Sequence, residues 1–133
     1  MKKLFLFAAL LGAVAWSSSL VPTAATNGPG HKEQAVFQFN EPVVLLGVTL
    51  KGEYLFVHDD AAMARAGEAC TFVYKGNADV SDKLVVSFHC TPAERSKVAQ
   101  FTVRTAESIP GLVELREFQF GGSTEAHLVP AAK

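Results

Sequence analysis

From Gln34 onward, apolar and polar side chains alternate in short segments that are separated by turn-forming residues. Alternation with a period of two places every second side chain on one face of a strand, as in antiparallel sheets. The pattern predicts a mainly β domain, an antiparallel sandwich or small barrel of about six to eight strands. The expected strands are 34–40, 43–50, 53–58, 69–75, 83–90, 98–106, 112–120 and 125–129.

Two short segments favour helical turns between these strands. Asp60 can cap one or two turns through Ala61–Ala66, with Gly67 as the stop. Residues 91–94 (Thr-Pro-Ala-Glu) have the spacing of a capping box, with proline at the first helical position. Both segments are too short to be stable alone, so we expect surface turns.

The register of one hairpin follows from the pattern around Pro110-Gly111. One face of this hairpin is apolar and the other polar, so a one-residue slip would mix the two faces. The same register sets Glu107 opposite Glu114, a repulsion that the predicted hairpin does not explain. The apolar pairs are Phe101 with Phe120 and Val103 with Phe118, and the polar pairs are Thr102 with Gln119 and Arg104 with Glu117.

Both cysteines lie in a second predicted hairpin, centred near Val80. In the expected register Cys70 faces Cys90, at a Cα separation that a disulfide tolerates. A metal-binding or redox-active pair is the alternative, but neither Cys-x-x-Cys nor Cys-x-x-Cys-His spacing is present. We expect a structural disulfide, which stabilises the fold by about 3 kcal/mol in the chain-entropy model. The pairs that continue the same buried face are Phe72 with Phe88 and Tyr74 with Val86.

Residues 1–25 have the tripartite pattern of a secretory signal peptide. Lys2 and Lys3 precede an uncharged apolar run, and small residues follow, with the expected cut after Ala25. A membrane anchor or a buried first helix is disfavoured, because spanning a bilayer takes roughly 20 apolar residues. We expect a secreted or periplasmic protein, where oxidised cysteines are the usual state. Residues 26–33 are expected as a flexible lead-in and 34–130 as a single domain.

The charge balance argues against nucleic-acid binding. The whole chain has 12 basic and 13 acidic side chains, a formal net charge of −1. Removal of residues 1–25 takes two of those lysines and the only tryptophan, leaving 10 basic side chains against 13 acidic and a net charge of −3. No Lys/Arg cluster or second membrane-spanning apolar run remains, so a protein or a small molecule is the expected partner.

His58-Asp59-Asp60 is the most suggestive polar cluster. Histidine and aspartate suit zinc or a harder cation, so His58, Asp59, His89 and His127 form a candidate metal site. Against this site, no two histidines have His-x-His or His-x-x-x-His spacing, and His89 and Cys90 point to opposite strand faces. The competing interpretation is that the two aspartates end a strand and cap a turn.

No catalytic constellation is recognisable. Gly121-Gly122-Ser123 is not part of a Gly-x-Ser-x-Gly motif and is expected as a turn. No phosphate loop, dinucleotide fingerprint or calcium loop occurs. We therefore expect no catalytic residue and no cofactor, although paired carboxylates for acid–base work remain open.

Residues 39–56 (Phe-Asn-Glu-Pro-Val-Val-Leu-Leu-Gly-Val-Thr-Leu-Lys-Gly-Glu-Tyr-Leu-Phe) resemble a pattern in uncharacterised small exported bacterial all-β proteins. Those proteins carry a strand, a Pro-Val step and a Thr-Leu-x-Gly-x-Tyr-x-Phe hairpin. Lys51 stands where a Pro-Ala pair is usual, which implies a shorter turn here. The resemblance implies an all-β fold and no activity or site residue.

The leading hypothesis is an exported, non-enzymatic domain that binds a ligand or supports an assembly in the envelope or outside the cell. Binding would use loops 59–68, 76–82 and 121–125, or an exposed strand edge. The alternative is a small metal-binding protein or metal-dependent enzyme that uses His58, Asp59, His89 and His127. A subunit whose apolar surface is completed by a partner is the third hypothesis.

Overall fold

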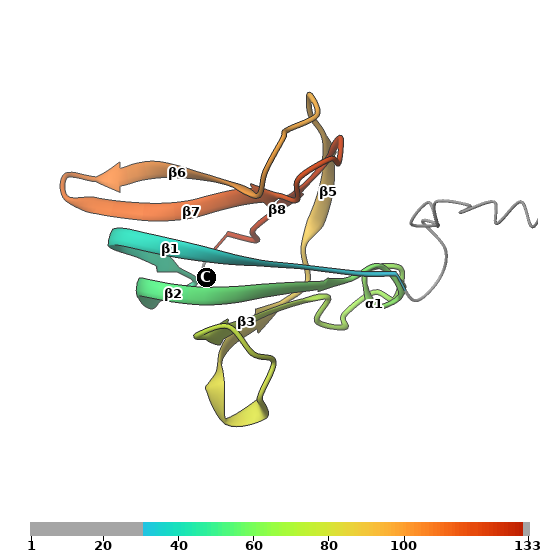
Figure 1. Cartoon of the computed structure of the whole chain (residues 1–133). Helices are drawn as coiled ribbons and strands as arrows, with labels where there is room; N and C mark the ends of the chain where they lie inside the picture. Colours follow the sequence, from blue (N-terminus) through green and yellow to red (C-terminus); the bar gives the residue numbers. More distant parts are fainter. Residues whose placement is uncertain (1–30, 132–133) are drawn as a thin grey trace, which may run out of the picture.

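The computed structural model describes residues 31–131, and the predicted signal peptide lies outside them. These residues form one eight-stranded sheet with a four-residue helix and a short 3-10 turn, which confirms the mainly β fold (Figure 1). In this part of the chain, no helix has the length and apolar character needed to cross a membrane. The elements are β1 (Lys32–Leu45), β2 (Val48–Asp59), α1 (Asp60–Met63), β3 (Thr71–Lys75), η1 (Ser81–Lys83), β4 (Leu84–Phe88), β5 (Thr91–Glu94), β6 (Thr102–Ile109), β7 (Leu112–Gln119) and β8 (Glu125–Leu128).

The order of the strands makes the sheet curl back on itself. Hydrogen-bonded neighbours follow the order β4-β3-β2-β1-β7-β8-β5, and β6, which is outside this order, pairs with β7. All pairs are antiparallel except β1 with β7, which are parallel through Val44 and Glu114. The two ends of this order, β4 and β5, are joined by only His89 and Cys90. The two outer strands must therefore approach each other, and the sheet forms a half-barrel (Figure 1).

The first hairpin turns earlier than the sequence suggests. Its loop is Leu46-Gly47, with φ values of 48° and 83°, so the predicted strand 43–50 is split in two. Positive φ at two successive residues is the geometry of a two-residue type I′ turn. The turn expected at Lys51-Gly52 is wrong, because Gly52 lies inside β2 opposite a bulge in β1.

Two segments expected to be irregular or helical are strands. Residues 91–94 form β5, which pairs with β8, rather than a capped turn. Pro92 is tolerated because β5 is an edge strand, where its missing N–H disturbs no inner ladder. The lead-in predicted for 26–33 is wrong at Lys32 and Glu33, which pair with Asp59 and His58.

The helix that follows β2 is shorter than predicted and has a different cap. Asp59, still in extended conformation, accepts hydrogen bonds from the N–H groups of Ala61 (3.0 Å) and Ala62 (3.4 Å). Asp60, the expected cap, is instead the first helical residue. Its carboxylate is therefore available for another contact.

The predicted register of the β6–β7 hairpin is confirmed at Thr102–Gln119 and the two pairs that follow it. The expected ion pair also forms, with Arg104 Nη1 2.9 Å from Glu117 Oε2. A bulge after Arg104 then shifts the register, so Glu107 faces Val113. The repulsion with Glu114 that the regular register implied is thereby removed.

The predicted register of the cysteine hairpin is wrong by one residue. Thr71 pairs with Phe88 and Val73 with Val86. The fully buried face of β3 therefore carries Thr71 and Val73, whereas the predicted register places Phe72 on the buried face. Pattern alone could not decide this register, because Phe72, Val73 and Tyr74 make both faces of β3 apolar. The two cysteines lie just beyond the paired residues, at the end of the hairpin.

Aromatic side chains fill the inside of the half-barrel. Phe56 and Phe118 are fully buried, with ring centroids 5.5 Å apart, and they link the two halves of the sheet. The remaining buried core residues are Phe39, Val43, Leu45, Leu50, Tyr54, Ala62, Cys70, Val73, Phe88, Cys90, Leu115 and Phe120.

Candidate metal centre

Three buried donor residues meet where the sheet closes. His58 lies near the end of β2, His127 lies in β8, and Cys90 lies in the junction between β4 and β5. Each residue is fully buried, and one donor atom from each lies within 4.8 Å of the other two. We call His58, Cys90 and His127 the inner cluster.

The spacing of the inner cluster suits a single metal ion. Cys90 Sγ lies 3.7 Å from His127 Nδ1, and the two imidazole centroids are 3.9 Å apart. With metal–sulfur and metal–nitrogen bonds of about 2.3 and 2.0 Å, sulfur and nitrogen ligands lie about 3.5–3.7 Å apart. The sulfur–nitrogen distance therefore already matches the edge of a coordination polyhedron.

The imidazoles of the inner cluster lack the partners that buried polar atoms usually have. Within residues 31–131, the buried side-chain nitrogens without a hydrogen-bond partner are His58 Nδ1, His58 Nε2 and His127 Nε2. Each such atom costs about 1–3 kcal/mol when no ligand or solvent compensates. Three of them on two adjacent rings indicate a site that a ligand completes.

Asp60 is placed to orient His58. Its Oδ1 lies 3.2 Å from His58 Nδ1, a close contact whose angles fall outside hydrogen-bond geometry. A metal-bound histidine commonly presents its second ring nitrogen to a carboxylate, which fixes the ring. Because Nδ1 lies beside the Asp60 carboxylate, we assign Nε2 of His58 as the atom that would bind an ion.

Burial sets the protonation of all three donors. Burial, together with the neighbouring His58, lowers the pKa of His127 to about 3. Burial also lowers the pKa of His58, against the opposing effect of Asp60. Both imidazoles are therefore neutral near pH 7, the form that binds metals. Burial and the hydrogen bond with Cys70 raise the pKa of Cys90 to about 12, so an ion must displace its proton.

The two cysteines come together as expected, but as free thiols. Cys70 Sγ and Cys90 Sγ are 2.9 Å apart, whereas a disulfide bond measures about 2.05 Å. The predicted Cys70–Cys90 disulfide is therefore wrong for this structure, in which both cysteines are free. Because of the register slip the residues are not directly opposed, and Cys90 N–H donates to Cys70 Sγ at 3.1 Å.

Only half of the metal site predicted from sequence is assembled. His58 and His127 meet, whereas Asp59 caps α1 and His89 Nδ1 lies 2.6 Å from the carbonyl oxygen of Glu68 at the surface. His89 and Cys90 lie in the junction between β4 and β5 rather than within a strand, and Cys90 is fully buried whereas His89 is partly exposed. Cys90 is absent from the predicted site because the sequence favours a Cys70–Cys90 disulfide and has neither Cys-x-x-Cys nor Cys-x-x-Cys-His spacing.

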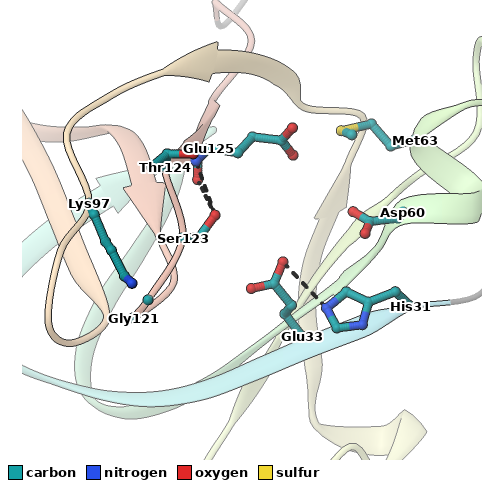
Figure 2. Close-up of a pocket in the computed structure, with 10 residues that line it drawn as sticks. His31, Glu33, Asp60, Met63, Lys97, Gly121, Ser123, Thr124 and Glu125 are labelled. Atoms are coloured by element: carbon teal, nitrogen blue, oxygen red, sulfur yellow. Dashed lines mark hydrogen bonds and ion pairs between the residues drawn. The ribbon is translucent and has the colours of Figure 1, made fainter. Parts of the chain in front are cut away.

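An open pocket of about 780 Å³ lies beside the inner cluster. Asp60 and Met63 line this pocket and also touch the cluster, since Met63 Sδ lies 3.8 Å from Cys90 Sγ. Figure 2 shows these two side chains on one side of the pocket, above His31 and Glu33. His31, Glu33 and Asp60 form a second group whose donor atoms lie within 4.8 Å of one another. Of the predicted binding loops, 59–68 and 121–125 both contribute to the pocket.

We expect the metal-free protein to lose stability on acidification from about pH 6.5 towards pH 3. Above pH 6.5 His127 is neutral in both the folded and the unfolded state, so the stability is complete. Below pH 6.5, His127 takes up a proton in the unfolded chain, whereas in the folded protein it stays neutral down to about pH 3. The free energy of unfolding therefore falls over this range. Urea unfolding in the presence of a chelator measures this slope.

The control for the acid experiment is His127→Phe, which keeps an aromatic ring against Phe118 without a titrating group. Its free energy of unfolding should depend less on pH than that of the wild type over the same window. Equal slopes for the two proteins would contradict the assignment of a depressed pKa to His127.

Comparison of the chain with protein-family models, with curated proteins and with solved structures finds no match in any of the three. The resemblance of residues 39–56 to exported proteins stays a prediction, and function has to be inferred from the inner cluster and its pocket.

Proposed function

We propose that this protein is an exported β domain that binds a transition-metal ion through His58, Cys90 and His127. The observation that carries the proposal is the convergence of three fully buried donors within 4.8 Å, two of them imidazoles with unpartnered nitrogens. Imidazole nitrogen and thiolate sulfur are ligands that first-row transition metals accept readily.

The arrangement favours binding over catalysis. A catalytic zinc site keeps one position open for water or substrate, whereas the donors of the inner cluster have no exposed surface. Phe118 stacks against His127 with ring centroids 5.1 Å apart, and Phe120 packs against both imidazoles. The aromatic rings around the donors leave no room for a substrate beside the ion, which supports a binding site rather than a catalytic one.

Export is carried by the N-terminal sequence. The pattern of Lys2-Lys3, an apolar run and small residues before Thr26 is that of a cleaved secretory signal. Export places the chain where free thiols tend to oxidise. A bound ion would protect the Cys90 thiolate there, which makes the two parts of the proposal compatible.

Metal content tests the proposal directly. We expect the purified reduced protein, incubated with zinc(II) and freed of excess by gel filtration, to retain about one ion per chain by elemental analysis. His127→Ala and Cys90→Ser should each lower the affinity by more than about 100-fold, because even outer partners of a metal contribute 10–100-fold. Asp60→Asn, which alters an outer partner, should lower it by about 10–100-fold.

His89→Ala is the matched control, because His89 lies at the surface and hydrogen bonds to Glu68 outside the inner cluster. It should bind the ion as the wild type does. Circular dichroism of each variant separates loss of a ligand from loss of the fold. A reduced wild-type protein that retains neither zinc(II) nor copper(I), or equal losses in His89→Ala and His127→Ala, would refute the proposed site.

A further inference from the structure

Sulfur atoms gather on one side of the inner cluster. Cys90 Sγ lies 2.9 Å from Cys70 Sγ and 3.8 Å from Met63 Sδ. The imidazole of His127 approaches the same sulfur at 3.7 Å. The three sulfur atoms come from α1, from the residue before β3 and from the β4–β5 junction, and Cys90 Sγ, which contacts the other two, also faces His127.

The carboxylates stay at the margin of this arrangement. Asp60 Oδ1 lies 3.2 Å from His58 Nδ1, and Glu125 Oε1 lies 3.9 Å from His127 Nδ1 with the Glu125 side chain 45 % exposed. Both residues line the open pocket. The buried donors are therefore soft, and the hard oxygen donors remain in contact with solvent.

We propose that the ion is monovalent copper and that Met63 completes its ligand set beside Cys90 and the two histidines. Soft thiolate and thioether ligands select copper(I), whereas carboxylates and water suit hard divalent cations. Zinc shares the thiolate and imidazole preference, but thioether sulfur is not among its usual ligands. The contact between Met63 and Cys90 is thus the feature that distinguishes the two ions.

Charge balance in the buried site agrees with a monovalent ion. Binding replaces the proton of the Cys90 thiol, which leaves to solvent as the sulfur–copper bond forms, with no change of oxidation state. One thiolate then neutralises copper(I) completely, while a divalent ion would leave one net positive charge unless Cys70 also lost its proton. Uncompensated charge is costly among aromatic side chains such as Phe118 and Phe120.

The pocket supplies a route for the ion. Met63 is the last residue of α1 and lines the pocket (Figure 2). Its sulfur lies 3.8 Å from Sγ of the fully buried Cys90. An ion that enters past the carboxylates of Glu33 and Asp60 therefore meets the thioether of Met63 before the thiols. Met63 is a ligand and also the point of transfer into the cluster.

The test is competition between two ions in wild-type protein and Met63→Leu. This inference rests on the proposed metal site, so the experiment measures both ions. Copper(I) is supplied anaerobically from a colorimetric copper(I) chelator of known affinity, and zinc(II) is titrated separately and as a competitor. Leucine conserves the volume of methionine in the core, so the fold should be retained.

We expect Met63→Leu to lower the copper(I) affinity by about 10-fold and to leave the zinc(II) affinity unchanged. Zinc(II) in tenfold excess should not displace copper(I) from the wild type, and X-ray absorption of the copper-loaded protein should show more than one sulfur neighbour. His89→Ala should match the wild type for both ions.

The possible failures are distinguishable. Equal copper(I) affinity in the wild type and Met63→Leu, or displacement of copper(I) by zinc(II), overturns the inference and leaves the metal site in place. If the wild type binds neither ion, or if His127→Ala binds both as the wild type does, the proposed function itself is wrong.

Discussion

Loading the protein with its ion should raise the free energy of unfolding by about 4 kcal/mol when the free ion reaches 1,000 times its dissociation constant. The effect is large because the unfolded chain separates the three donors, whose positions in sequence are 58, 90 and 127. The ion therefore binds the folded state far more tightly than the unfolded chain. For a domain of this size, such a gain raises the melting temperature by more than about 15 °C.

Thermal unfolding with and without the ion measures this gain, with a chelator in the metal-free sample. His89→Ala should show the same shift as the wild type, whereas His127→Ala should show little or none. A shift that persists in His127→Ala would mean that the ion stabilises the fold from a site other than the inner cluster.

Phe118→Ala should lower the free energy of unfolding by about 3–5 kcal/mol, even in the metal-free protein. Phe118 is fully buried, and its removal leaves a cavity at the centre of the half-barrel. The free energy of unfolding of a domain of this kind is about 5–15 kcal/mol, so the variant should be only marginally stable at room temperature. The aromatic neighbours of Phe118 are Phe56, Phe88, Phe101, Phe120 and His127.

Urea unfolding compares this variant with Ile109→Ala at the end of β6. Ile109 is 60 % exposed, and its loss should cost less than about 0.5 kcal/mol. Because Phe118 also stacks on His127, the same variant should bind the ion more weakly than the wild type. A cost below about 1 kcal/mol for Phe118→Ala would contradict the central place of Phe118 in the core.

Strand positions were predictable where only one face of a strand is apolar. The β6–β7 hairpin follows its predicted register from Thr102 to Arg104, since any slip would exchange apolar and polar faces. In β3 both faces are apolar, and the register slips by one residue from the prediction. Bulges in β1 and β6 shift the register further, because an extra residue in a strand leaves no mark in a period-two pattern.

The sequence by itself determined the β class and the nearness of Cys70 to Cys90, because these depend on neighbours along the chain and on side-chain alternation. Only the tertiary structure decided the inner cluster. His58 and His127 lie on β2 and β8, which meet Cys90 because the sheet curls until β4 and β5 are joined by two residues. Strand order and curl arise from packing between distant segments, so no spacing of ligands along the chain records them.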